Sequence, residues 1–209
     1  MFRSRIPAFA KIFLPQIICR PETGGKKIVY LTFDDGPIPE TTPYVLTTLK
    51  KYGIKATFFC VGENVKKHPE LYAHILEDGH FVGNHTFNHL KGWKTSLNAY
   101  LENVQECSKY IESGLFRPPY GKMTVQQYNA LKNKFKLIFW DVLTPDYDLN
   151  VSAQQCLDII KKKTRQGSIL VFHDNLKAKN KLTELLPGAL DFLIREGYEI
   201  QPVTNNISK

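Results

Sequence analysis

The feature that most constrains this chain is a regular alternation of short apolar segments with longer amphipathic segments. The predicted strands cover residues 27–33, 56–61, 80–84, a short piece before 117, 135–139, 169–172 and 199–203. The predicted helices cover residues 42–53, 69–79, 97–111, 124–133, 152–163 and 183–197. Strands that alternate with helices form parallel sheets, because each parallel pair needs a crossover connection. We therefore expect an α/β protein with about seven β/α units.

Local signals support several of these helices. Pro43 stands in the first turn of the helix that begins at Thr42, where its missing amide hydrogen costs nothing. Ser152 with Gln155 forms the pattern of a capping box, which predicts a helix start at residue 152.

Chemically reactive side chains follow the apolar segments at their C-terminal ends. The clearest case is Asp34-Asp35, which ends the first predicted strand and precedes Gly36-Pro37. Adjacent carboxylates repel each other unless a cation lies close by or one of them binds a proton. Other apolar segments lead into His85 and His89, Arg117, Trp140 and Asp141, and His173 and Asp174. Such residues gather at the C-terminal mouth of a barrel, so we expect a distorted, TIM-barrel-like (β/α) barrel short of eight units rather than an open sheet.

The two histidines suggest a metal site. His85 and His89 are four residues apart, and on a helical turn they would share one face. Two imidazoles with one carboxylate suit zinc and leave a position open for water, as in catalytic zinc sites. A histidine pair alone is weak evidence, and an isolated Asp-Asp-Gly is often a solvated turn. Their combination in one chain favours metal binding.

Length and composition indicate one domain over residues 1–209, with a core of about 27–203 and an N-terminal extension of 1–26. The cysteines at 19, 60, 107 and 156 lack CxxC spacing and are predicted to be small buried side chains. The net charge of +8 is compatible with an anionic polymer as partner. No basic stripe is interleaved with aromatic residues, so nucleic acid is not a predicted partner, and the pattern indicates no particular oligomeric state.

The N-terminal segment has mixed signals. Arg3 and Arg5 precede the apolar residues 6–19, but Lys11 and Pro15 interrupt that run and no small-residue cleavage site follows. No stretch reaches the roughly 18 apolar residues of a membrane-spanning helix. We expect an amphipathic N-terminal helix packed on the fold, without a transmembrane segment or a convincing export signal.

Taken in order, the motifs TFDDG, HTFNH, RPPYG, a tryptophan-led aspartate-rich segment and VFHD resemble those of the polysaccharide deacetylases, carbohydrate esterase family four. The resemblance covers residues 27–203. It implies a distorted (β/α) barrel that hydrolyses N-acetyl or O-acetyl groups on chitin, peptidoglycan or xylan with a divalent metal, either Zn²⁺ or another ion such as Co²⁺. The implied partner is an N-acetylated glycan, a substrate class that suggests the cell envelope.

The same resemblance implies a role for each residue of the motifs. Asp34 resembles the catalytic base, His173 the general acid, and Arg117 the residue that orients the base. Asp35, His85 and His89 resemble the metal ligands. Pro118 and Tyr120 fall in the substrate-binding motif, where the Tyr120 amide is implied as an oxyanion donor, and Trp140 and Val171 match positions lining the pocket for the acetyl methyl group.

One motif departs from the family pattern. Leu143 stands where the family commonly has an acid expected to support the catalytic histidine, and Tyr147 stands where it has tryptophan. Asp141 and Asp146 are the alternative supports for His173. Two other functions compete with glycan deacetylation: a metal-dependent amidase acting on a small molecule, suggested by the short loops, and a non-catalytic carbohydrate binder. The binder would be expected to lack a ligand or the base, and neither is missing.

Overall fold

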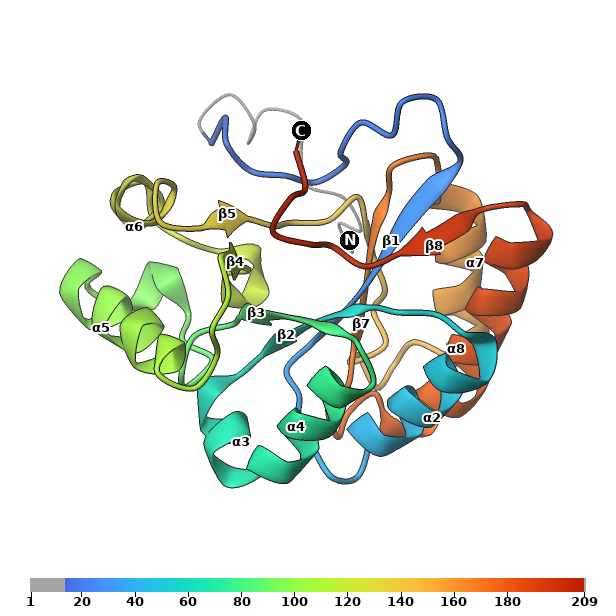
Figure 1. Cartoon of the computed structure of the whole chain (residues 1–209), viewed down its shortest axis with the longest axis horizontal. Helices are drawn as coiled ribbons and strands as arrows, with labels where there is room; N and C mark the ends of the chain where they lie inside the picture. Colours follow the sequence, from blue (N-terminus) through green and yellow to red (C-terminus); the bar gives the residue numbers. More distant parts are fainter. Residues whose placement is uncertain (1–13, 209) are drawn as a thin grey trace.

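The computed structural model describes residues 14–208, which form a parallel sheet curled into an incomplete barrel with helices around its outside (Figure 1). The strands are β1 (Ile28–Asp34), β2 (Thr57–Cys60), β3 (Phe81–Asn84), β4 (Leu115–Phe116), β5 (Lys136–Leu137), β6 (Val142–Leu143), β7 (Ile169–His173) and β8 (Glu199–Gln201). Their order is β5-β4-β3-β2-β1-β7-β6, and β8 pairs with the first half of β1. The predicted distorted barrel is confirmed.

The helices connect these strands. They are α2 (Thr42–Tyr52), α3 (Gly62–Lys67), α4 (Pro69–Glu77), α5 (Leu97–Ser108), α6 (Val125–Leu131), α7 (Ala153–Lys163) and α8 (Lys179–Arg195), with short 3₁₀ helices η1 (Gly92–Lys94) and η2 (Pro119–Gly121). The capping box of Ser152 and Gln155 is present. Helix α3 was not predicted, and α8 begins four residues before Thr183. Neither helix has a side-chain cap at its start, so the sequence carries no start signal there.

The predicted fifth strand, residues 135–139, is shorter in the structure, and it is followed by β6, which was not predicted. β5 pairs with β4, and β6 pairs with β7 at the other end of the sheet, so one stretch of chain, residues 136–143, joins both ends. Ile18 fills the place beside this stretch: its amide donates to the Leu137 carbonyl (2.8 Å), and its own carbonyl accepts from the Phe139 amide (2.7 Å). Residues 14–19 therefore form a turn and a β-bridge, not the predicted helix. The rest of that predicted helix lies outside the described residues.

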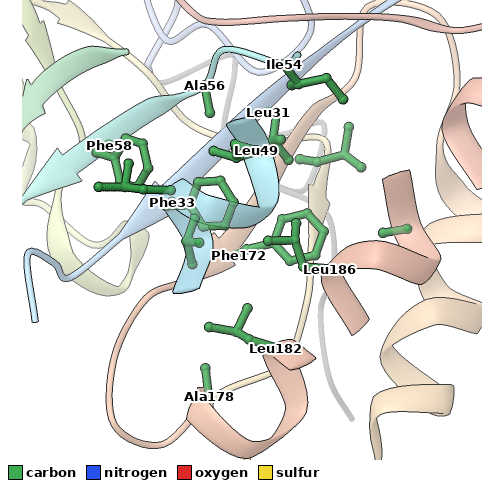
Figure 2. Close-up of a cluster of buried hydrophobic side chains, with 14 of the residues drawn as sticks. Leu31, Phe33, Leu49, Ile54, Ala56, Phe58, Phe172, Ala178, Leu182 and Leu186 are labelled. Carbon is green, nitrogen blue, oxygen red and sulfur yellow. The ribbon is translucent and has the colours of Figure 1, made fainter. Parts of the chain in front are cut away.

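Along β1, successive side chains point alternately to the two faces of the sheet. Val29, Leu31 and Phe33 pack into the main apolar core between the sheet and the helices. Figure 2 shows Leu31 and Phe33 in this core among side chains of α2, α8 and neighbouring strands. Since successive side chains alternate between the two faces, Thr32 and Asp34 face the interior of the barrel. Polar groups on β1 are thus directed away from the helices and toward the barrel mouth.

Two further predictions concern the cysteines and membrane-spanning helices. All four cysteines are buried, as expected of small apolar side chains. Within residues 14–208, no helix has the length and apolar character needed to cross a membrane.

Truncating the core should destabilise the fold. Leu186 of α8 is completely buried in the main core (Figure 2), so Leu186→Ala should lower the free energy of unfolding by about 2–5 kcal/mol through lost apolar contact and a cavity. Leu149→Ala is the matched control, because Leu149 is 77% exposed. Urea denaturation of both variants checks this, and equal stability of the two would contradict the assignment of α8 to the core.

Candidate active site and metal centre

The reactive side chains gather where the strands end. Asp34 ends β1, His85 follows β3, Arg117 follows β4 and His173 ends β7. In the sheet, Asp34 is in register with His173 of β7 on one side and with Phe59 of β2 on the other. The central position of β1 therefore brings residues separated by more than a hundred positions in sequence to one barrel mouth.

Asp35, His85 and His89 form a cluster able to hold a metal ion. One ligand atom from each residue lies within 4.8 Å of the others. His89 Nε2 is 3.1 Å and His85 Nε2 is 3.6 Å from Asp35 Oδ1. Burial alone would raise the pKa of Asp35, but the neighbouring His89, His173 and His85 outweigh this and hold that pKa below its ordinary value. The carboxylate is therefore negative at neutral pH.

The orientation of His85 fits a cation. Its Nδ1 lies 2.6 Å from the Arg117 carbonyl oxygen, which can only accept, so Nδ1 carries the hydrogen. Burial lowers the pKa of His85 to about 4, so its Nε2 is an unprotonated lone pair facing Asp35. Asp35 Oδ1 is itself buried without a hydrogen-bond donor of good geometry. A lone pair and a carboxylate oxygen turned toward each other repel unless a cation binds between them, so these residues fit a metal ion.

The loops that carry this cluster have unusual backbone conformations. The non-glycine residues with positive φ in the described chain are Asp35 (88°), Thr86 (63°), His89 (55°) and Tyr120 (61°). A residue other than glycine adopts this left-handed backbone conformation only at a cost in free energy, which the surrounding structure must offset. All four lie in the motif loops at the barrel mouth, as expected where function fixes the backbone.

Asparagine side chains support two of these conformations, those of Asp35 and Thr86. Asn175 Nδ2 donates to Asp35 Oδ2 (2.6 Å), and Asn64 Nδ2 donates to the Asp35 carbonyl (2.8 Å). Asn84 Oδ1 accepts from the Thr86 amide (2.9 Å). These supports were not predicted. The only signal for Asn84 was its place directly before His85.

Arg117 makes the central ion pair. Its guanidinium is fully buried, and Nη1 donates to Asp34 Oδ1 (2.6 Å) and to Thr32 Oγ1 (2.8 Å). Nε and Nη2 donate to the carbonyls of Ile138 and Phe139, each at 3.2 Å. The side chain therefore fixes the Asp34 carboxylate and ties it to the segment that joins the ends of the sheet.

Asp146 supports His173. Its Oδ1 lies 2.6 Å from His173 Nδ1, and its Oδ2 accepts from the His173 amide at 2.8 Å. Burial lowers the pKa of His173, but the Asp146 carboxylate outweighs that effect and raises the pKa to about 9. Of the two candidate supports Asp146 is thus the correct one, because Asp141 binds Arg165 and Ser168 instead. Although Leu143 stands where the family commonly has an acid, His173 still has a carboxylate partner.

Of the predicted substrate-binding residues, Tyr120 lies against the metal cluster, and Trp140 and Val171 lie in an apolar cluster. Tyr120 is half exposed, with its ring centroid 4.7 Å from that of His89. Trp140 and Val171 share one buried apolar cluster with Leu143. A β-carbon on Gly121 would lie 2.3 Å from the Trp140 ring, so the RPPYG loop packs directly against this cluster only with glycine there. Pro118 is buried in the same loop.

Asp174 anchors the loop after Asp35, a role that the sequence did not reveal. Its carboxylate accepts from the Gly36 amide (2.9 Å) and from Thr42 Oγ1 (2.6 Å). Complete burial raises its pKa to about 7. The side chain therefore joins the end of β7 to the start of α2 across the Asp34-Asp35 turn.

The protein is therefore an α/β protein with an Asp-His-His cluster and two buried charge pairs at the mouth of a curled parallel barrel. Residues 22–135 match the sequence model of the family described as polysaccharide deacetylase. A peptidoglycan-N-acetylglucosamine deacetylase of Bacillus cereus is 31% identical over 187 residues, which is 86% of this chain and 88% of that protein. The chain belongs to the polysaccharide deacetylase family, and the predicted resemblance is confirmed.

Solved structures agree with this assignment. The peptidoglycan N-acetylglucosamine deacetylase Bc1960 superimposes with a TM-score of 0.78 at 26% identity and covers 95% of both chains. BA3943 of Bacillus anthracis, described as a pseudoenzyme of carbohydrate esterase family four, has a TM-score of 0.78 at 26% identity over 90% of this chain and 67% of its own.

Removing Arg117 should cost far more stability than removing an exposed ion pair. Arg117→Ala leaves the Asp34 carboxylate buried beside the barrel interior without its partner, and should lower the free energy of unfolding by about 3–5 kcal/mol. Lys67→Ala, which removes one partner of the exposed Lys67–Glu63 pair, should change it little. Denaturant unfolding compares them, and a stable Arg117→Ala protein would show that the pair is dispensable for the fold.

Proposed function

We propose that this protein is a metal-dependent hydrolase that removes acetyl groups, chiefly N-acetyl, from a carbohydrate such as peptidoglycan or a chitooligosaccharide. The observation that carries the proposal is the meeting of the Asp35-His85-His89 cluster with the Asp34–Arg117 and His173–Asp146 pairs at one barrel mouth. The named activities of the relatives support the same substrate class.

Asp35, His85 and His89 would hold the metal. Two imidazole nitrogens and one carboxylate oxygen are the donor set of catalytic zinc sites, so Zn²⁺ is the proposed ion and Co²⁺ a possible substitute. When bound, the ion would acidify a water molecule and polarise the acetyl carbonyl.

Asp34 is proposed as the base. Its Oδ1 is held by Arg117 at 2.6 Å, which orients the carboxylate at the mouth beside the metal ligand Asp35. In this position it would take the proton of the attacking water. Arg117 is then a positioning residue, since it acts through Asp34.

His173 is proposed as the acid that protonates the departing amine. Its pKa of about 9, raised by Asp146 against the effect of burial, keeps the imidazolium form present at neutral pH. The Tyr120 backbone amide is proposed to donate to the oxyanion that forms at the acetyl carbon. Pro118 would shape that loop, and Trp140 and Val171 would receive the acetyl methyl group through their apolar cluster.

Membership of the family does not by itself establish turnover, because the similar BA3943 is described as a pseudoenzyme. In this chain each proposed part is present: base, three ligands, acid, and a charged partner for both base and acid. This complete set favours an active enzyme over a binding protein.

Two substitutions separate the proposed roles. Asp34→Asn should lower turnover by about 10²- to 10⁴-fold and leave bound metal unchanged, because it removes the base and no ligand. His85→Ala should lose the metal itself, whereas His74→Ala, on the exposed surface of α4, should keep both. Metal content and acetate release from chitooligosaccharides and peptidoglycan fragments, with and without chelator, measure these effects. Near-normal turnover of Asp34→Asn would show that another group is the base.

The acid should reveal itself in the pH dependence. The Asp146 charge stabilises the imidazolium of His173, so the active protonated form persists until the pH rises through about 9. Asp146→Asn removes that charge, lowers the pKa of His173, and should move the alkaline decline of kcat/KM to lower pH. Asp148→Asn removes a charge nearby on the same loop and should leave the decline in place. An unshifted profile in Asp146→Asn would mean that His173 does not supply the proton.

A further inference from the structure

Two loops beside the metal cluster hold each other through reciprocal contacts. The first contains Lys91 and Trp93 around η1, and the second contains Tyr120 and Lys122 around η2. Lys91 of the first loop places its Nζ 4.9 Å from the centre of the Tyr120 ring, and Lys122 of the second places its Nζ 5.1 Å from the Trp93 ring. These four residues are called here the aromatic–lysine platform.

Trp93 is fixed although its ring is exposed. Its side chain is 65% exposed, yet Nε1 donates to the Met123 carbonyl at 2.9 Å. The preceding Gly92 is buried, and a β-carbon there would lie 2.5 Å from the Lys122 carbonyl oxygen. The indole is therefore oriented by its polar edge, Lys122 lies over its ring, and 65% of the side chain remains exposed. Such a prearranged aromatic face can bind a ligand with little loss of side-chain entropy.

The platform differs from the other lysine–tyrosine contacts of the described chain. Lys132 lies over Tyr128, which is buried, and Lys27 lies over Tyr198, which is partly buried. Those rings are held by the packing around them. In the platform both rings are exposed, Tyr120 at 50%, and both lysines are exposed as well. The platform therefore offers aromatic and ammonium groups to a ligand, which the other two pairs do not.

The position of the platform connects it to the proposed reaction. The Tyr120 ring lies 4.7 Å from the ring of His89, one of the proposed metal ligands. A glycan with its acetamido group at the metal cluster could extend across Tyr120 toward Trp93. Aromatic faces pack against the apolar C–H faces of sugar rings, and exposed ammonium groups attract carboxylates.

We propose that the aromatic–lysine platform binds a carboxylate-bearing sugar next to the sugar that loses its acetyl group. This inference rests on the proposed deacetylase function. It predicts a preference for anionic over neutral acetamido glycans, in agreement with the net charge of +8.

Binding measured without turnover tests the proposal. The Asp34→Asn protein would be titrated with three oligosaccharides of equal length: a neutral N-acetylglucosamine oligomer, one with a carboxylate on alternate sugars, and the methyl ester of the latter. The chain has only two tryptophans, and Trp140 is 7% exposed, so iodide quenching reports mainly on Trp93. We expect the acid to bind about fivefold more tightly than its ester and to shield Trp93 from iodide.

Variants identify the residues responsible. Adding Lys91→Gln and Lys122→Gln together should abolish the preference for the acid, and adding Trp93→Ala should weaken binding of all three oligomers. Lys27→Gln is the matched control: it removes one lysine from a tyrosine face at the other end of β1 and should preserve the preference. Equal binding of acid and ester, or a preference that survives loss of both lysines, would overturn the proposal.

Acetate release by the wild-type protein separates this proposal from the one on which it rests. Release from neutral and anionic oligomers at equal kcat/KM would uphold the deacetylase and refute the platform. Absence of release from every oligomer by metal-loaded protein would refute the deacetylase function, and the assignment of the platform as its subsite with it.

Discussion

A fully buried guanidinium holds this structure and its site together. Arg117 binds Asp34 through its side chain, binds His85 through its carbonyl oxygen, and donates to the carbonyls of Ile138 and Phe139 in the segment that joins the ends of the sheet. A buried charge is costly unless it is paired and its donors are satisfied. Asp34 meets that requirement, so the proposed base, one proposed ligand and the closure of the barrel depend on a single residue.

Backbone strain is concentrated in the loops at the barrel mouth, around these Arg117 contacts. Asp35, Thr86, His89 and Tyr120 all occupy the left-handed region, and each lies in a loop after a strand of the sheet. At Asp35 and Thr86 this cost is offset locally by asparagine side chains and by Asp174, which bind the same loops. A rigid frame built on Arg117 and these supports would keep the proposed ligands prearranged before a metal binds.

The sequence predicted the architecture and the reactive residues because both follow from local pattern: apolar strands ended by polar residues, and glycine, proline and capping residues at helix ends. It failed where distant contacts decide. The predicted fifth strand is reduced to Lys136–Leu137, and Ile18, far away in sequence, pairs with the chain there through the Leu137 carbonyl and the Phe139 amide. Asp146 rather than Asp141 supports His173 because the chain leaves β6 after Leu143 and turns back, a course that spacing along the sequence does not specify.

The two levels of the site depend on different parts of the fold. The proposed base, ligands and acid rest on strand ends and on the buried Arg117. The loop of Lys91 and Trp93 rests on α6 instead: Gln127 completes the capping box of that helix through Oε1 and donates to the Gly92 carbonyl through Nε2. This half of the platform is therefore fixed by a helix that makes none of the Arg117 contacts. Substitutions of Lys91 and Trp93 can alter which sugars bind without disturbing the buried charge pairs on which the proposed chemistry depends.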